Sequence, residues 1–278
     1  MRKTISIGKQ SFSSLREHDN FFVDKTNFIK EWWEKEDDIT LIARPRRFGK
    51  TLNMSMLECF FSNKYANRAD LFEGLSIWEE EKYRQLQGTY PVIFLSFASV
   101  KADNLTEAKI QIKQEIAVLY EENRYLLKKD ILSDNERKLY NRTTEQMDDT
   151  TAQKAIRNMA AWMHRYYGKN VIILLDEYDT PMQEAYLQGY WDEYTSFIRS
   201  LFNATFKTNS YLERAIMTGI TRVSKESVFS DLNNLNVVTT TSDEFWRLME
   251  YFPICFWAGL IVQHQIIMRL LMPCYREI

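Results

Sequence analysis

Residues 171–179 read VIILLDEYD, five consecutive apolar residues followed by three acids within four positions. A strand with one face in water alternates apolar and polar residues, whereas a continuous apolar run indicates a strand covered on both faces. Such strands are typical of parallel sheets with helices on both sides. This segment therefore favours an α/β fold. Its acids would lie at the carboxyl edge of the sheet, where open α/β sheets bind ligands.

Four further short apolar or β-branched runs alternate with longer amphipathic stretches, which is the pattern of βαβ units in a mostly parallel sheet. We expect these runs to form strands over residues 39–43, 91–97, 213–222 and, most weakly, 236–241.

Two longer segments have the apolar spacing of helices. The first is 106–129, where Ile112, Ile116, Leu119 and Tyr120 would form the buried face. The second is 152–168, and Gly168 would end it. The polar segment 129–150 is expected to be a loop or an exposed helical excursion.

Composition limits the classes of protein to consider. With 278 residues and 45% hydrophobic content, the chain can form one large domain, and it contains no internal repeat or Gly/Ser linker. The formal charge is -2, so any basic surface for nucleic acid or membrane would have to be local. Three cysteines and an N-terminus without an apolar signal segment fit the cytoplasm, and the three histidines have no ligand partners at metal-binding spacing.

Residues 41–51 read LIARPRRFGKT, an expected strand followed by a tight loop and a helix start. In this context backbone N–H groups and a helix N-terminus surround a phosphate chain. Gly49 would let the backbone approach the anion, Lys50 would reach the β- and γ-phosphates, and the Thr51 hydroxyl would coordinate Mg²⁺. The expected nucleotide-binding residues are Arg44, Pro45, Arg46, Arg47, Phe48, Gly49, Lys50, Thr51 and Leu52.

This loop departs from the usual GxxxxGK[ST] pattern, because Arg44 stands at the position of the first glycine and Pro45 would have to set the bend. Taken alone, Gly-Lys-Thr is also compatible with an ordinary helix start bearing a solvated lysine. The acidic motif supports the phosphate interpretation, since Asp176 could hold Mg²⁺ and Glu177 could polarise an attacking water. A lone Asp176 could instead cap a helix, and we expect that role of Asp179.

Four segments together resemble the AAA-ATPase-like family of bacterial proteins: FFVDKTNFIKEWW, RPRRFGKT, LLDEYDTPM and TGITRVSKESVFSDLNNL. The resemblance covers residues 8–245. It implies a P-loop NTPase of the additional-strand type, with a strand between the phosphate-loop strand and the acidic-motif strand, and 91–97 supplies such a strand. Members often carry a C-terminal PD-(D/E)XK nuclease-like domain, and in this family arginine can replace the first glycine of the loop.

The resemblance also implies roles for individual residues. Thr218 would sense the γ-phosphate, and Arg222 would either stabilise the transferred phosphoryl group or form a surface salt bridge. Phe21 and Phe22 are either neighbours of the adenine or core residues, and the core is the more common position for such aromatic side chains. Arg46 and Arg47 could bind phosphate, the acids of the second motif or a partner.

The tail from Trp246 onward is densely apolar and contains no Asp. We therefore expect a domain over 1–245 followed by an atypical tail over 246–278 that is truncated or out of the family's reading frame. The run 252–262 is too short to cross a membrane, so we expect no membrane partner. The remaining residues contain no combination of acids and a lysine that is typical of a nuclease site. Family analogy is therefore the sole basis for a nucleic-acid partner.

Three functional interpretations remain. The first is Mg²⁺-dependent ATP hydrolysis that drives a conformational switch, in a site that ATPases of this class often complete across the interface of a homo-oligomer. The second is a nucleotide-gated regulatory scaffold that binds ATP with little turnover. The third is a phosphotransferase, against which the pairing of Glu177 with Asp176 weakly argues.

Overall fold

The computed structural model describes residues 4–6, 8–45, 48–128, 130–220, 229 and 234–238. These residues contain one sheet in which every neighbouring pair of strands is parallel, in the order β2-β3-β4-β1-β5. Each of the five predicted runs overlaps a strand, and the α/β fold with a parallel central sheet is confirmed. The strands are β1 (Ile39–Ala43), β2 (Val92–Ser96), β3 (Val171–Asp176), β4 (Leu212–Gly219) and β5 (Leu235–Val238).

The order of the strands corrects one expectation. The run 91–97 forms β2, which lies between β1 and β3 in the chain but at the outer edge of the sheet, beside β3. The strand that separates β1 from β3 in space is β4, which pairs with both of them. An apolar run shows that a strand is buried, but it does not show which neighbours it will pair with, because that depends on the crossover connections.

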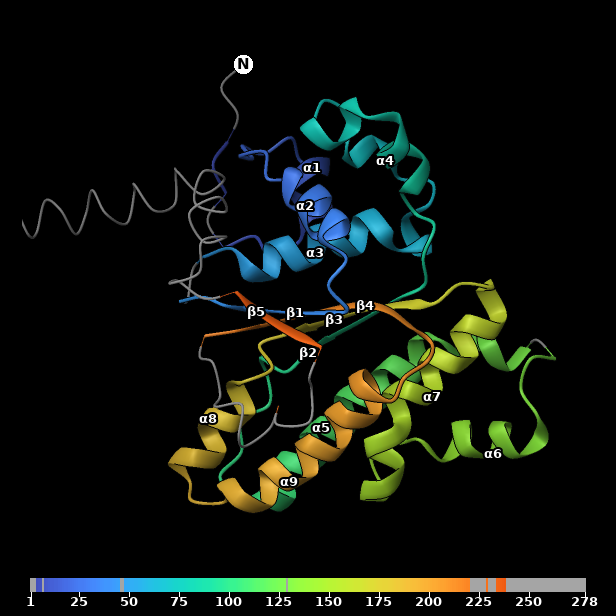
Figure 1. Cartoon of the computed structure of the whole chain (residues 1–278). Coiled ribbons are helices and arrows are strands. Elements are labelled where there is room, and N and C mark those ends of the chain that lie inside the picture. The colour runs from blue at the N-terminus through green and yellow to red at the C-terminus, as the bar shows by residue number, and fades with distance from the viewer. Residues whose placement is uncertain are drawn as a thin grey trace, which may run out of the picture.

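Helices cover both faces of the sheet (Figure 1). One face carries α1 (Phe12–Glu17), α2 (Asn27–Lys35), α3 (Lys50–Phe61) and α4 (Glu81–Leu86). The opposite side carries α5 (Leu105–Glu122), α6 (Asp134–Arg142), α7 (Asp149–Tyr167), α8 (Thr180–Leu187) and α9 (Trp191–Phe202). Short 3-10 helices cover Asn63–Tyr65, Ala69–Leu71, Ser76–Glu79 and Arg124–Lys128, and a π-helical turn covers Asn203–Lys207. None of the described helices is long and apolar enough to cross a membrane.

Local sequence signals explain where several helices begin and end. The Asp148 carboxylate caps α7, and Gly168 ends it in the left-handed conformation with φ of 69°, as predicted. The polar segment 129–150 contains α6, which begins with a capping box between Ser133 and Glu136. Of the two structures expected for this segment, a loop or an exposed helix, the protein therefore forms the helix.

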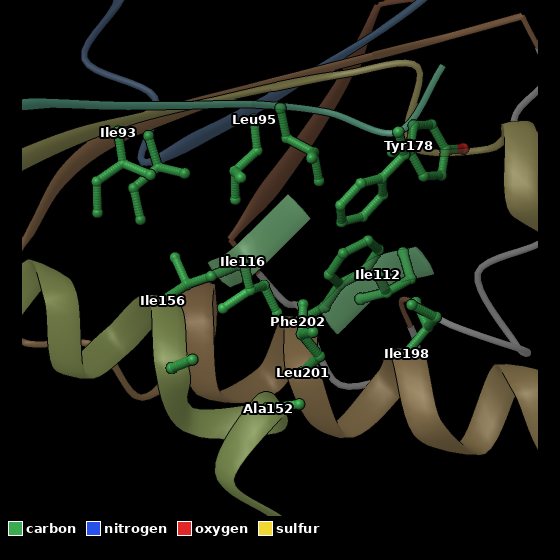
Figure 2. Packing of buried hydrophobic residues seen from close by; sticks show 14 of the residues in the cluster. Ile93, Leu95, Ile112, Ile116, Ala152, Ile156, Tyr178, Ile198, Leu201 and Phe202 are labelled. Carbon is green, nitrogen blue, oxygen red and sulfur yellow. The ribbon is translucent and has the colours of Figure 1, made fainter. Parts of the chain in front are cut away.

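The core lies in two layers, one on each side of the sheet. Figure 2 shows Ile93 and Leu95 of β2 facing Ile112 and Ile116 of α5, whose burial was predicted from helical spacing. Residues on the opposite face of the strands, such as Ile172, pack against the α1–α4 side. Burying a side chain of this size contributes about 1.5–3 kcal/mol, so the two layers hold the sheet and its carboxyl edge in place.

Candidate functional site

The loop between β1 and α3 has the strand–loop–helix arrangement that the sequence predicts. Gly49 adopts the left-handed conformation with φ of 71°, and α3 begins at the next residue. Glycine has no side chain that could cap the helix, and no side-chain cap is formed at Gly49. The positive end of the helix dipole at this point favours an anion. Thr51 and Leu52 are half-buried in this first turn.

The ammonium group of Lys50 is folded back onto the loop. Its Nζ donates hydrogen bonds to the carbonyl oxygens of Arg44 and Pro45, at 2.9 and 3.0 Å. Lys50 is 9% exposed, and the neighbouring Arg44 is 4% exposed. Burial lowers the pKa of Arg44 to about 10, so its guanidinium stays charged at neutral pH. Two cationic side chains therefore lie at the base of the loop.

Some predicted site residues lie outside the described residues. These are Arg46 and Arg47 in the loop and Arg222 after β4. The tail over 246–278 also lies outside them. The roles assigned to these residues stay predictions.

A small hollow lies beside the loop, with a volume of about 20 Å³. Polar groups on its wall come from the loop, α3 and β4, and apolar groups come from α2, β1, the loop and α3. Its lining consists of Phe28, Ile42, Arg44, Phe48, Lys50, Asn53, Met54 and Thr218.

The sequence patterns did not identify Phe28, Ile42, Asn53 or Met54 as lining residues of this hollow. Asn53 and Met54 lie on the turn of α3 that follows the Gly-Lys-Thr residues, so helical spacing could have found them. Phe28 comes from α2 and carries no local signal. Phe22, which was predicted to be a core residue or a neighbour of the adenine, packs edge-on against Phe12 with ring centroids 5.4 Å apart.

The acidic motif forms a turn at the carboxyl end of β3. Asp176 is the last residue of the strand and is 1% exposed, and its carboxylate accepts a hydrogen bond from the hydroxyl of Thr218 on β4. The Thr218 hydroxyl oxygen also accepts a hydrogen bond from the backbone N–H of Glu177, at 3.4 Å. The Thr218 carbonyl accepts from the N–H of Tyr178, at 3.0 Å. Thr218 therefore connects the end of β4 to three consecutive residues of the acidic turn.

Asp179 stands at the N-cap position of α8, as predicted, but its carboxylate does not cap the helix. The Asp179 Oδ2 instead accepts hydrogen bonds from the backbone N–H of Ile220 and the side chain of Gln183, both at 2.9 Å. The predicted capping role is wrong because the carboxylate is bonded to the residue that follows β4 and to Gln183. A Cβ on Gly219 would lie 2.6 Å from Tyr178 Cε1 and 2.7 Å from Asp179 Oδ1, so this approach requires glycine.

The two motifs meet at one edge of the sheet. Ala43 at the end of β1 pairs with Gly219 of β4, and the N–H of Arg44 donates to the Gly219 carbonyl at 3.0 Å. With β4 between them, the ends of β1 and β3 are two strand spacings apart, about 10 Å. Thr218 lines the hollow beside Lys50 and bonds to Asp176. The structure thus brings the loop and the acidic turn together around this threonine.

The side chains predicted to hold Mg²⁺ carry the kind of donor atom that this ion prefers. A Thr51 hydroxyl and an Asp176 carboxylate are hard oxygen ligands, and Mg²⁺ usually keeps several waters while binding one or two protein groups and substrate phosphates. Within the described part of the chain, no cluster of three or more His, Cys, Asp or Glu residues could hold another metal ion.

A parallel α/β sheet with a Gly-Lys-Thr loop at one strand end and adjacent acids at another is characteristic of P-loop nucleoside triphosphatases. The family model described as Predicted AAA-ATPase matches residues 6–229, and the chain belongs to this family.

The chain is also similar to a protein from Azotobacter chroococcum mcd 1 that is described as an uncharacterized protein in the vnfD 5′ region. The two are 28% identical over 243 residues, which is 87% of this chain and 42% of the relative. The chain therefore spans less than half the length of this relative. No solved structure matches the chain.

Proposed function

We propose that this protein binds ATP together with Mg²⁺ and hydrolyses it, and that hydrolysis drives a conformational switch. The observation that carries the proposal is the position of Thr218. It lines the hollow beside Lys50 and bonds to the carboxylate of Asp176 and the N–H of Glu177. A phosphate chain lying against Lys50 would therefore be separated from the Asp176 carboxylate and the backbone of Glu177 by Thr218 alone.

Binding would use the loop and the first turn of α3. The Lys50 ammonium would exchange the carbonyls of Arg44 and Pro45 for phosphate oxygens, and charge-assisted bonds of this kind are about twice as strong as neutral ones. Backbone N–H groups at the start of α3 would donate to the same phosphates. Thr51 and Asp176 would hold Mg²⁺, which when bound neutralises charge on the phosphate oxygens.

Hydrolysis would use the acidic turn. The Glu177 carboxylate would accept a proton from a water whose oxygen forms a bond to the γ-phosphorus, while the bond from phosphorus to the β–γ bridging oxygen breaks. The products would be ADP and inorganic phosphate. Thr218 would respond to loss of the γ-phosphate because it contacts both motifs, and Arg222 would stabilise the charge that develops on the transferred group.

We assign this activity to a domain over residues 1–245 and place its site at an interface in a homo-oligomer. The family model, which matches residues 6–229, supports the domain assignment. An arginine supplied by a second chain can complete the site of a P-loop NTPase, and this supports the assignment to an interface.

The proposal is tested by titrating ATP with and without Mg²⁺ and by following phosphate release. Lys50→Met keeps the length of the side chain and should weaken ATP binding by about 10- to 100-fold, because the charge-assisted bonds to phosphate are lost. Glu177→Gln should bind ATP like the wild type and release phosphate only at a small residual rate. Lys64→Met, at a lysine whose side chain is 42% exposed, is the matched control and should change neither quantity.

Equal ATP affinity in the wild type and in Lys50→Met would overturn the assignment of the loop. Tight binding by the wild type without phosphate release would favour the scaffold interpretation. Transfer of the γ-phosphoryl group to an acceptor other than water would favour a phosphotransferase.

A further inference from the structure

Glu177 has an unusual backbone conformation. Its φ is 51°, in the left-handed region that residues other than glycine rarely adopt. Such a conformation persists when the surrounding structure determines it. Here the N–H groups of Glu177 and Tyr178 both donate to Thr218, and the Tyr178 ring packs near Phe202 with centroids 6.5 Å apart (Figure 2). Hydrogen bonds to Thr218 from two consecutive backbone N–H groups therefore fix the backbone of the acidic turn.

The side chain of Glu177 is held as well, by Thr180, a residue to which the sequence alone assigned no role. The Thr180 hydroxyl donates to Glu177 Oε2 at 3.1 Å, and the Thr180 N–H donates to the Glu177 carbonyl at 3.2 Å. Thr180 is 7% exposed and is the first residue of α8. Its branched side chain has few rotamers, and Pro181 fixes the next φ of the helix start. The hydroxyl is therefore a rigidly placed donor.

We propose that Thr180 is a positioning residue for ATP hydrolysis, which holds Oε2 of Glu177 so that Oε1 faces the attacking water. This inference rests on the proposed function, because it assumes that Glu177 accepts the proton. A carboxylate has two oxygens and about four acceptor sites, so a bond to Oε2 leaves Oε1 able to accept a proton. The bond restricts a side chain that otherwise has three rotatable bonds. Orientation of this kind determines the rate because a displacement of about 1 Å can cost about 100-fold.

The first test is Thr180→Val, which removes the hydroxyl and keeps the branched shape. We expect kcat to fall by about 10- to 100-fold while the Kd for ATP stays within about twofold, since Thr180 acts on the chemical step. Thr180→Ser restores the donor and should restore most of kcat. Thr195→Val is the matched control, because the Thr195 hydroxyl is also buried, 5% exposed, and also donates three residues back, to the Asp192 carbonyl at 3.0 Å. It should leave kcat unchanged.

The second test separates positioning from a general loss of structure. In a Glu177→Gln background, Thr180→Val should lower the residual rate no further, because the carboxylate that it orients is gone. Urea unfolding gives a readout that does not depend on activity. The effects of Thr180→Val and Glu177→Ala on the free energy of unfolding should not add, since both substitutions remove the same hydrogen bond.

A wild-type kcat in Thr180→Val, no rescue by Thr180→Ser, or additive effects on unfolding would overturn the role of Thr180 and leave the proposed hydrolysis intact. Absence of phosphate release from the wild-type protein would overturn both. The two failures are therefore distinguishable.

Discussion

The hydroxyl of Thr218 on β4 donates a hydrogen bond to the carboxylate of Asp176 at the end of β3. The two residues are 2% and 1% exposed. A buried carboxylate is tolerated when hydrogen bonds replace its lost water, so this contact stabilises the acid as well as locating it. Because β4 also pairs with β1, the same threonine links the proposed metal ligand to the strand that leads into the phosphate loop.

Replacing Thr218 with valine should therefore affect stability and function together. Thr218→Val keeps the shape but removes the donor to Asp176 and the acceptor for the Glu177 N–H, which leaves buried polar groups unsatisfied at a cost of about 1–3 kcal/mol. We expect a matching fall in the free energy of unfolding measured in urea, and slower phosphate release. Thr218→Ser keeps the hydroxyl and is the control. If serine and valine lowered stability equally, the hydrogen bonds would not be the cause.

Gly219 should not tolerate a methyl group, although its backbone is not left-handed. In Gly219→Ala the new Cβ would lie 2.6 Å from Tyr178 Cε1 and 2.7 Å from Asp179 Oδ1, so the acidic turn must shift. Overpacking of this kind typically costs about 1–3 kcal/mol. The shift should also lower turnover, because Glu177 lies in the same turn.

The control for that substitution is Gly189→Ala. Gly189 has a φ of 79° but nothing within 4 Å of its Cβ position, so its cost should be backbone strain of about 1 kcal/mol, with turnover unchanged. Thermal unfolding and phosphate release measure the two effects. Wild-type turnover in Gly219→Ala would show that the turn does not need its present position.

The strands were predictable from short apolar or β-branched runs, most clearly at 171–175, where β3 is buried along its whole length. The order of the strands in the sheet was not predictable, because it depends on the crossover connections, and the apolar runs contain no information about those connections. Thus 91–97 was correctly predicted to be a strand, but it lies at the edge of the sheet, and β4 occupies the position beside β1.

The residues of the candidate site also fall into two groups, those that local sequence patterns identified and those that only tertiary packing brings to the site. Gly49, Lys50 and Asp176 were identified from local patterns, because a loop and a strand end each carry their chemistry within a few residues. Phe28 was not, since it reaches the hollow by tertiary packing of α2. The bond from Asp179 to Ile220 joins residues 41 positions apart, and no local pattern could show that it replaces the expected cap.

Stability in acid should depend on Glu136. Hydrogen bonds from Arg165, and further ones from Ser133 and Trp162, lower the pKa of Glu136 from its ordinary value of 4.5 to about 2. A lowered carboxylate pKa contributes stability that is present above the unfolded value and is lost as pH falls through the folded value. The contribution should therefore be complete above about pH 4.5 and disappear toward about pH 2.

Urea unfolding of wild type and Glu136→Gln across this pH range measures that contribution. The difference in the free energy of unfolding should be constant at neutral pH and shrink as the pH falls below about 4.5. Glu121→Gln, at an exposed acid of α5 that pairs with Arg124, is the control and should show little difference at any pH. A Glu136→Gln difference that does not change with pH would show that the carboxylate charge is not what stabilises this contact.

The left-handed backbone of Glu177 predicts a conflict between stability and activity at one residue. Glycine adopts a φ of 51° without strain, whereas alanine carries the same steric penalty as glutamate, about 1–2 kcal/mol. After the greater chain entropy of unfolded glycine is subtracted, Glu177→Gly should be more stable than Glu177→Ala by about 0.5–1 kcal/mol. Neither variant should release phosphate, because both lack the carboxylate. Urea unfolding and phosphate release on the two variants check this, and an alanine variant at least as stable as the glycine variant would mean that residue 177 is not strained in the folded protein.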